Sequence, residues 1–535
     1  MFFLLFFSSF LLSCLFLGGA SFFLEIFTPL NFYIEGGFFF QLDFISLLFF
    51  SAVSLISSVV FIYRRFYMHI ILPLLFNLDK RFFYLLGRFV ISIIFLVFSG
   101  SWFTVLLGWD GLGLTSFLLV IFYSNRLRLV SGLVTFLINR LGDCFFILSF
   151  IFFYFSGGFR LDFLGKEFSF FFLIILVLGC TTKRAQVPFS SWLPLAIAAP
   201  TPVSSLVHSS TLVTAGVYLI IRLNYLIIDI RGFIIFLSLL TLLLGGLCAL
   251  VERDLKKIVA ISTLSQLGFI FLSIGIGFYT LAFFHMVFHA FFKSRIFLST
   301  GRIINSLGGG QDSRFFGSMT ISFSAKVFYS IRCFRLVGFP FSLGFYSKDM
   351  ILGESLSLGF FLTVFIFLLG CLLTVSYRRL LLYMGFCGWP TFPLRLNFFE
   401  RAKFFLPLIT LYMFCCFSGN FFLLYFLPCP SFNLLERVIG LILIFGGVIL
   451  RRLIKFNYFS SHFFSFIGFL FFLNSYFSYN FKLVNFKDEN SWREVFRGNG
   501  FYSFFYRFNN IIFYLLEPRA LFFFIIFLYL LGAFI

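Results

Sequence analysis

Long apolar stretches separated by short polar segments recur along the whole chain of 535 residues. A membrane hydrocarbon core about 30 Å thick requires ~20 apolar residues in a helix, and most of the stretches approach that length. Their pattern lacks the regular alternation of polar and apolar residues typical of outer-membrane barrels, and helices satisfy their own backbone hydrogen bonds in lipid. We therefore predict an all-α polytopic membrane protein with about fourteen to sixteen transmembrane helices. The apolar stretches lie at residues 2–24, 38–63, 82–100, 102–123, 131–156, 168–182, 203–222, 232–251, 257–278, 279–300, 316–332, 349–375, 404–427, 433–450, 462–480 and 519–535.

Two further stretches, 184–205 and 334–347, are interrupted by proline and glycine. Transporters built from inverted repeats carry discontinuous helices at corresponding positions of their two halves, near the middle of the membrane. A lysine accompanies each interruption, Lys183 before the first and Lys348 after the second. Simple loops between spans are the alternative; we favour broken helices because both interruptions have a lysine beside them. The interrupting residues are Pro188, Pro194, Pro200 and Pro202 in the first stretch, and Gly338, Pro340 and Gly344 in the second.

The two ends of the chain differ in pattern. Residues 1–16 are apolar and lack both the basic start of a secretory signal and the arginine-rich character of a mitochondrial presequence, so we expect the first membrane helix there. Residues 481–510 mix charged side chains with Phe and Tyr, which is typical of an amphipathic helix lying at a membrane surface. The apolar residues 519–535 then predict a terminal anchor helix.

Composition supports a membrane protein and narrows its partners. Hydrophobic residues make up 61% of the chain and charged residues 11%, whereas soluble domains carry roughly 25% charged residues. Lys and Arg number 40 against 20 Asp and Glu, a net charge of +20. These cations lie mainly in short loops, which is typical of topology signals and of contacts with anionic lipids such as cardiolipin. Because no aromatic-basic recognition module accompanies the charge, we expect no nucleic-acid partner.

The ten cysteines form no C-x-x-C pair, and most of them lie inside apolar stretches, where a free cysteine behaves as a small hydrophobic residue. No ligand set for an iron–sulfur cluster, a haem or a zinc ion can be assembled from their spacings. A glycine-rich phosphate loop in a strand–helix setting is also missing from the sequence. We therefore expect the chain to bind no redox cofactor.

Charged side chains inside the predicted spans are candidates for function, because each costs roughly 2.5–3.5 kcal/mol on insertion scales. Asp110 lies between glycines within an apolar stretch, and Lys183 directly follows another. A carboxylate and an ammonium that share a site stabilise each other's charge, so we predict that Asp110 pairs with Lys183. His208 lies in an apolar helix beside three hydroxyl residues. Either a proton relay or a structural histidine would suit that position.

His285, His289 and Lys293 repeat every four residues in one apolar helix. Such positions stay within about 80° of arc and span about 12 Å along the helix axis, so they predict a stripe of titratable groups. A proton relay fits this stripe. Zinc binding is the alternative, although the pattern lacks the intervening glutamate of a zinc protease and a third ligand.

Lys348 and Asp349, directly after the second interrupted stretch, complete the set of candidates. Three other acidic residues lie close to the ends of predicted spans, and we expect them to be structural or loop charges nearer the membrane surface. They are Asp143, Glu252 and Asp254. Among these three, Asp143 is the one that we single out as a possible functional residue instead.

Six sequence strings, taken together in their order, resemble one family. They are GWDGLGLTSFLL, NRLGD, PTPVSSLVHSST, DLKKIVAISTLSQLG, HMVFHAFFKS and GFYSKD, all within residues 99–350. This region resembles the antiporter-like subunits of respiratory complex I and the large subunit of multi-subunit sodium/proton antiporters. Within that family, the Lys348-Asp349 pair and the arm and anchor at 481–535 point to the largest antiporter-like subunit of complex I.

The resemblance implies two inverted five-helix repeats, each with a broken helix, and a lateral C-terminal helix followed by an anchor. It also implies a central polar axis, in which the pair formed by the acidic residue at 110 and Lys183 drives protonation. The family usually has glutamate at this position, whereas Asp110 is one methylene shorter, which reduces its reach toward Lys183. The implied axis residues are Lys183, His208, His289, His285, Lys293 and Lys348.

The function that the resemblance implies is that of a proton-translocating membrane-arm subunit, which couples quinone reduction elsewhere in the complex to proton pumping. NADH, FMN, iron–sulfur clusters and ubiquinone would then belong to partner subunits. The adjacent antiporter-like subunit (chain 4) would be a direct neighbour in the mitochondrial inner membrane. Two alternatives stay open: a subunit of a stand-alone multi-subunit cation/proton antiporter, and a structural subunit whose charges are relics. The implied organisation is N-terminal helices at 1–98, a translocating core at 99–375, C-terminal helices at 376–480 and the arm and anchor at 481–535.

Overall fold

The computed structural model describes the chain in several ranges, all within the unit Met1–Asn457. These ranges are 2–15, 21–26, 38–71, 76–123, 125–155, 170–252, 254–306, 309–312, 338, 343–357, 361–387, 407–414, 439–440, 442–447 and 449. The predicted spans 316–332, 462–480 and 519–535, and the predicted arm at 481–510, lie outside the described residues. Their assignments, and the total number of spans, stay predictions.

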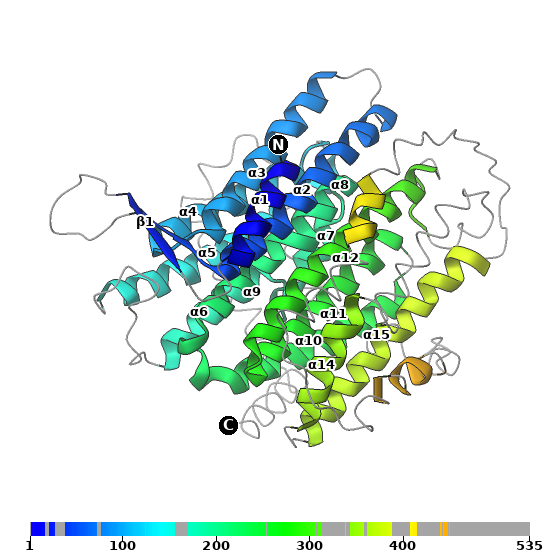
Figure 1. Ribbon diagram of the computed structural model, residues 1–535. Coiled ribbons are helices and arrows are strands. Elements are labelled where there is room, and N and C mark those ends of the chain that lie inside the picture. The colour runs from blue at the N-terminus through cyan, green and yellow to red at the C-terminus, as the bar shows by residue number, and fades with distance from the viewer. Residues whose placement is uncertain are drawn as a thin grey trace, which may run out of the picture. The chain divides into compact units, whose positions relative to one another are not determined.

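Helices dominate the described residues, which confirms the predicted class of a helical membrane protein (Figure 1). Within the described ranges, seven helical segments are long and apolar enough to cross a membrane. These candidate spans are Phe44–Met68, Trp102–Val120, Arg128–Phe152, Thr201–Arg222, Ile228–Leu250, Leu255–Ile276 and Tyr279–Asn305. The elements in chain order are α1 (Phe2–Leu15), β1 (Phe22–Ile26), β2 (Phe38–Leu42), α2 (Phe44–Ile71), α3 (Phe76–Val97), α4 (Trp102–Val120), α5 (Arg126–Phe155), α6 (Phe170–Lys183), η3 (Phe189–Ser191), α7 (Trp192–Ala196), α8 (Thr201–Val203), η4 (Ser204–Thr211), α9 (Leu212–Arg222), η5 (Asn224–Leu226), η6 (Ile228–Ile230), α10 (Arg231–Val251), α11 (Leu255–Ile276), α12 (Tyr279–Ser306), α14 (Leu343–Ser357) and α15 (Phe361–Cys387).

Two short strands replace parts of the first two predicted spans. β1 and β2 pair in antiparallel fashion, with Phe22 opposite Leu42 and Ile26 opposite Phe38. The prediction of one helix over 2–24 is therefore wrong beyond α1, and the stretch 38–63 begins as a strand. Phe and Ile are favoured in strands as well as compatible with membrane helices, and a short apolar run does not distinguish the two by hydropathy.

The predicted stretch 349–375 also departs from the structure, because it spans parts of two helices. α14 ends at Ser357 and α15 begins at Phe361. Ser357 and Gly359 are weaker helix formers than the leucines around them. An apolar average over the whole stretch hides this local weakness.

The first proline-rich stretch interrupts the helix, as predicted. α6 ends at Lys183, and Ala185 then adopts a left-handed backbone conformation with φ of 58°. Only short helical turns follow before Thr201, because prolines lack the N–H that a continuous helix requires. The π-helical segment η4 comes next and contains His208. The second interrupted stretch lies mostly outside the described residues, so its break stays a prediction.

The centre of the bundle consists of α11, α12 and the segment Thr201–Arg222, whose spans are fully enclosed by other parts of the chain. α10, α11 and α12 lie side by side (Figure 1). Glycine permits the close contact between α10 and α11: a Cβ atom added to Gly245 would lie 2.9 Å from the backbone nitrogen of Ser265.

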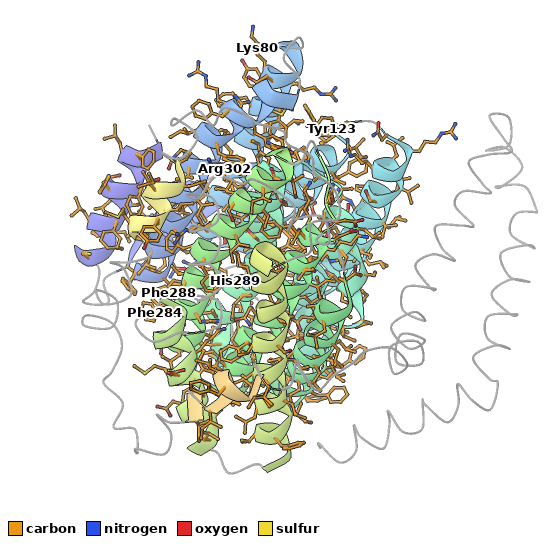
Figure 2. The ribbon with its side chains drawn as sticks, turned by 90° about the vertical axis from the view of Figure 1, so that its right-hand side faces the viewer. Lys80, Tyr123, Phe284, Phe288, His289 and Arg302 are labelled. Atoms are coloured by element: carbon orange, nitrogen blue, oxygen red, sulfur yellow. The ribbon has the colours of Figure 1, made fainter. Side chains whose placement is uncertain are left out.

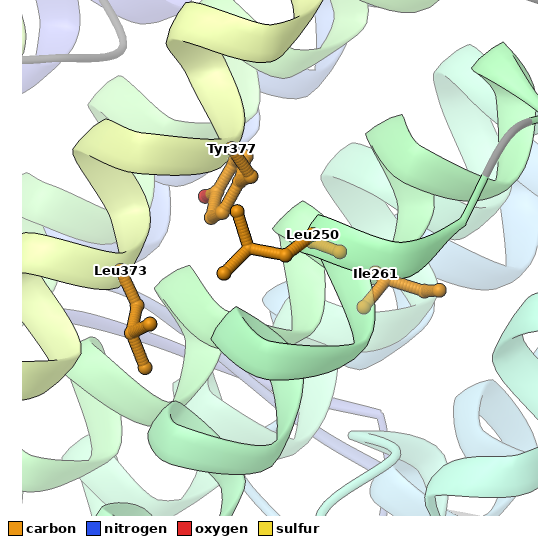
Figure 3. Close-up of a cluster of buried hydrophobic side chains, with 5 residues drawn as sticks. Leu250, Ile261, Leu373 and Tyr377 are labelled. Carbon is orange, nitrogen blue, oxygen red and sulfur yellow. The ribbon is translucent and has the colours of Figure 1, made fainter. Parts of the chain in front are cut away.

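α15 packs onto this helix pair through a cluster of buried side chains (Figure 3). Leu373 and Tyr377 of α15 belong to one cluster with Leu250 of α10 and Ile261 of α11. The Tyr377 hydroxyl also lies 3.2 Å from the hydroxyl of Ser265, with which it shares a hydrogen bond. This cluster fixes α15 beside the helices that carry the polar residues described below.

Replacing Gly245 with alanine should destabilise the protein, because the new methyl group would lie 2.9 Å from the Ser265 nitrogen. Overpacking of this kind costs about 1–3 kcal/mol, which should lower the thermal transition of the purified protein. Gly113→Ala is the matched control, since nothing lies within 4 Å of a Cβ atom there. Equal transition temperatures for the two variants would contradict the packing of α10 against α11.

Candidate functional site

Lys183 is enclosed at the end of α6, with 0% of its side chain exposed. Its ammonium donates a hydrogen bond to the backbone carbonyl of Trp109 on α4 and lies 3.8 Å from the centre of the Trp109 ring. The indole is held against Phe146 of α5, with ring centroids 4.3 Å apart. These neighbours stand in for the water that a buried ammonium has lost.

The carboxylate beside Lys183 belongs to Asp143 and not to Asp110. Lys183 Nζ lies 3.7 Å from Asp143 Oδ1, and the Asp143 side chain is only 7% exposed. Asp110 is 47% exposed and lies 3.9 Å from Arg140, which also lies 3.1 Å from Asp143. The predicted direct pair of Asp110 with Lys183 is therefore wrong. The structure instead has a row of alternating charges: Asp110, Arg140, Asp143 and Lys183.

Helix geometry explains this change of partner. Trp109 and Asp110 are consecutive on α4, so their side chains leave the helix about 100° apart, and the indole occupies the side facing Lys183. Asp143, singled out as the exception among the acidic residues expected to be structural or loop charges, lies within α5, three residues after Arg140. That spacing places the two on one helix face and could have predicted their pairing. It could not have predicted that Asp143 is buried.

His208 lies in η4 and is 3% exposed. Neither ring nitrogen has a hydrogen-bond partner among the described residues, and the ring lies edge-on to Trp192, with centroids 6.2 Å apart. The nearby hydroxyls of Ser209 and Thr211 donate to backbone carbonyls of their own segment. Their oxygens can still accept a hydrogen bond.

His285, His289 and Lys293 lie on one continuous helix, α12, and each is fully buried. His285 Nδ1 lies 2.7 Å from the hydroxyl of Ser347 on α14. Lys293 donates a hydrogen bond of 2.7 Å to the hydroxyl of Ser262 on α11. Figure 2 shows His289 about midway along the helices. The α12 stripe, as we call these three residues, thus contacts α14 at one end and α11 at the other.

Ser262 and Ser347 were not among the candidates from the sequence. They lie 31 and 62 residues along the chain from the side chains that they contact, so spacing gives no indication of either pair. The structure also bears on the alternative that His285 and His289 bind zinc. In the part of the chain that the structure describes, no three His, Cys, Asp or Glu side chains gather into a possible metal site.

Lys348 and Asp349 lie on α14 beside a cavity of about 30 Å³, which is large enough for a water molecule. Gln266 of α11 lines the same cavity and is 1% exposed. Neither of its amide atoms has a hydrogen-bond partner among the described residues. Gly440, which also lines the cavity, lies close to the Asp349 carboxylate: a Cβ atom added there would lie 3.1 Å from Asp349 Oδ1. Gln266 therefore joins the candidate residues, although a lone glutamine in an apolar helix did not single it out.

Asp254 lies in the turn between α10 and α11, outside the candidate spans. Lys257 approaches it to 2.8 Å. The hydrogen bond from this ammonium holds the pKa of the Asp254 carboxyl below its ordinary value. Glu252 follows directly after α10, as its C-terminal cap.

Known proteins match the chain over most of its length. Residues 99–374 match the family model for the transmembrane region of NADH:quinone oxidoreductase and Mrp antiporters. NADH-ubiquinone oxidoreductase chain 5 of Locusta migratoria is 37% identical over 505 residues, which cover 87% of this chain and 86% of that protein. The chain belongs to the NADH-ubiquinone oxidoreductase chain 5 family. The resemblance drawn from the sequence strings is thereby confirmed.

Two other chain 5 proteins agree with this assignment. Chain 5 of Artemia franciscana is 39% identical over 430 residues, or 78% of this chain and 77% of that protein. Chain 5 of Anopheles quadrimaculatus is 44% identical over 359 residues, or 65% of this chain and 61% of that protein.

A solved structure of a different protein complex has a similar fold. The matching structure is that of the Mrp complex from Dietzia sp. DQ12-45-1b, with a TM-score of 0.72 and 20% sequence identity. The match covers 92% of this chain and 58% of the Mrp chain. At this level of identity the likeness concerns the fold alone, which is an antiporter-like bundle of membrane helices.

Asp143→Asn should destabilise the protein more than Asp110→Asn. The first change leaves the buried ammonium of Lys183 without its carboxylate, and breaking a buried ion pair in this way costs about 3–5 kcal/mol. The second removes a longer and more exposed pair, typically worth about 0–1 kcal/mol. Thermal transitions of the purified variants measure the difference, with Asp143→Glu as the charge-retaining control. A larger loss for Asp110→Asn would restore the pairing expected from the sequence.

Proposed function

We propose that this chain is a proton-translocating membrane-arm subunit of NADH:ubiquinone oxidoreductase in the mitochondrial inner membrane. The observation that carries the proposal is the set of charged and titratable residues along the bundle, in which Lys183, Asp143 and the α12 stripe are buried. The row from Asp110 to Lys183 occupies α4, α5 and α6. The α12 stripe occupies the centre, and Lys348 and Asp349 lie beyond it on α14. Charges inside a membrane bundle mark ion and proton pathways by default, because they are costly.

The first step of the mechanism is an exchange of partners around Asp143. A buried lysine holds its proton better when a carboxylate lies beside it, and Asp143 is close to both Lys183 and Arg140. When the Asp143 carboxylate turns away from Lys183 and pairs with Arg140 alone, Lys183 loses its carboxylate and passes its proton to water or to the next base of the pathway. When Asp143 returns, Lys183 takes up another proton from water and the ammonium is restored. Asp110, on the far side of Arg140, controls which arrangement is favoured.

Later steps use hydroxyl and imidazole groups that can both donate and accept protons. Lys293 donates to Ser262, and His285 contacts Ser347, the residue directly before Lys348. A proton on His285 is therefore one hydroxyl away from the segment that carries Lys348 and Asp349. The cavity beside these two residues has room for water, which would continue the pathway.

We assign the redox chemistry to partner subunits. NADH, FMN, iron–sulfur clusters and ubiquinone would bind there, since the cysteine spacings of this chain supply no ligand set for a cluster. The contribution of this chain is the movement of protons in response to quinone reduction elsewhere in the complex.

The adjacent antiporter-like subunit, chain 4, would cover the face formed by α4 and α5. Only 33% of the most apolar window within Arg128–Phe152 on α5 is buried within this chain, against 100% for the equivalent windows of α11 and α12. Asp110 and Arg140 are partly exposed on this face, where contact with lipid would be costly. A protein neighbour would shield both charges. The apolar residues of the face include Leu107, Leu114, Leu137, Leu141, Ile147 and Ile151.

Exposed cations at the ends of helices would bind anionic lipid headgroups, including those of cardiolipin. Lys80 and Arg81 of α3 are exposed, and Lys80 projects at one end of the bundle in Figure 2.

A stand-alone cation/proton antiporter is the second candidate function, favoured by the fold match to the Mrp complex. Native-gel purification followed by identification of the co-migrating subunits separates the two. Flavin and iron–sulfur subunits in the same band support complex I. A small assembly without them would support the antiporter.

Lys183→Met and Lys293→Met should each abolish proton pumping while leaving the complex assembled, because methionine fills similar space without a transferable proton. The measurement is the number of protons translocated per NADH oxidised in sealed vesicles. Lys257→Met is the control, since that lysine is 46% exposed. Full proton stoichiometry in either axial variant would refute the proposal, and pumping that ignores every axial substitution would indicate a purely structural subunit.

Leu141→Trp should release this chain from the complex if a protein covers the α4–α5 face, because the larger ring cannot enter a packed interface without strain. Leu141 is 51% exposed within the chain, and Leu11 of α1, at 64%, provides the matched control as Leu11→Trp. Native gels report whether each variant migrates with the full complex. A fully assembled Leu141→Trp variant would show that lipid, rather than a subunit, faces this residue.

A further inference from the structure

Arg184, the residue directly after Lys183, is fully buried and points away from the Lys183 site. Its Nη2 donates a hydrogen bond of 2.6 Å to the backbone carbonyl of Leu267. The guanidinium lies 4.1 Å from the centre of the Phe271 ring. Leu267 and Phe271 are one turn apart on α11, so Arg184 is attached to a single short patch of that helix.

The guanidinium carries a positive charge that lacks an acidic partner in the described part of the chain. No carboxylate within those ranges lies within ion-pair distance of it, and its Nε and Nη1 atoms have no hydrogen-bond partner there. A guanidinium keeps its proton even when buried, unlike the ammonium of a lysine. Arg184 is therefore a fixed charge inside the membrane bundle. A carbonyl and an aromatic face reduce the cost of that charge but do not cancel it.

The position of this charge is between the two groups of titratable residues. Lys183 faces α4 and α5, whereas Arg184 faces α11, the helix whose Ser262 holds Lys293. A proton that leaves Lys183 for the α12 stripe must therefore approach a charge of its own sign.

We propose that Arg184 is an electrostatic barrier that suppresses passive proton movement between Lys183 and the α12 stripe. The inference rests on the proposed function, because it needs a proton pathway to guard. Channels that exclude cations and protons use a buried arginine in the same physical way. Driven transport can cross such a barrier because the partner exchange of Asp143 makes Lys183 release its proton. A leak driven only by a pH gradient lacks that assistance.

The test uses the assembled complex in sealed liposomes with quinone reduction inhibited. An imposed pH gradient then decays through passive leak, which a pH-sensitive dye reports. Arg184→Gln removes the charge but keeps a donor for the Leu267 carbonyl, and should raise the leak on the order of tenfold. This is the effect of a unit charge at roughly 12 Å where the effective dielectric constant is about 20. Arg184→Lys replaces the fixed charge with a titratable one, so its leak should match the parental rate at low pH and approach that of Arg184→Gln at high pH.

Three outcomes would overturn the barrier. The proposal is wrong if Arg184→Gln leaks no faster than the parent, or if Arg184→Lys leaks as fast as Arg184→Gln at every pH. It is also wrong if Arg184→Met, which lacks both the charge and the donor, leaks much faster than Arg184→Gln, because the leak would then follow the hydrogen bond rather than the charge. Leak through other subunits is common to all samples and cancels in the comparison.

A double variant separates failure of the barrier from failure of the proposed function. Adding Lys183→Met to Arg184→Gln should return the leak to the parental rate, since the pathway would lose its first proton carrier. A fast leak that persists in the double variant would mean that the protons bypass Lys183, which overturns the barrier as placed here. Normal pumping by Lys183→Met alone would instead remove the proposed function.

Discussion

A cation buried in a membrane bundle must find all of its stabilising neighbours inside the protein, and the central helices are arranged around this requirement. Lys183 draws on a carbonyl and a ring from α4 and a carboxylate from α5. These contacts fix how α4, α5 and α6 face one another. Lys293 draws on a hydroxyl of α11, which fixes α11 against α12. The interruption after α6 serves the same requirement, because it lets consecutive cations point toward different helices.

The two lysine sites differ in the kind of partner that the structure gives them. The Lys183 site contains a carboxylate, so its charge balance changes when that carboxylate moves. The hydrogen bonds that Lys293 donates to α11 go to a hydroxyl and a carbonyl, which are neutral groups. Movement of the Asp143 carboxylate would therefore change the charge balance at Lys183, whereas the Ser262 and Val259 contacts hold the Lys293 ammonium against α11.

Hydropathy and spacing predicted the class of the fold, the interruption after Lys183 and the titratable residues of α12. Each of these depends on local sequence: apolar length, proline, or a four-residue repeat. What the sequence could not supply was the orientation of one helix relative to another. Asp110 and Asp143 both lie in apolar helices, and only the packing of Trp109 decides which carboxylate reaches Lys183. Ser347 and Gln266 were missed for the same reason, since their neighbours come from distant parts of the chain. The β1–β2 pair was missed because a short apolar run suits strand and helix alike.

His208 differs from the other candidate residues because it lies in a π-helical segment, η4. A π-helix holds one residue more per turn than an α-helix, and its hydrogen bonds join residues five apart. At the two ends of η4 the backbone shows both patterns: the N–H of Ser204 donates to the carbonyl of Pro200, four residues back, and the N–H of Leu212 donates to that of Val207, five residues back. Moving the extra residue along the helix by one position would rotate a side chain that it passes by about 100°. A shift past His208 would therefore turn its imidazole toward different neighbours while the helix stays intact.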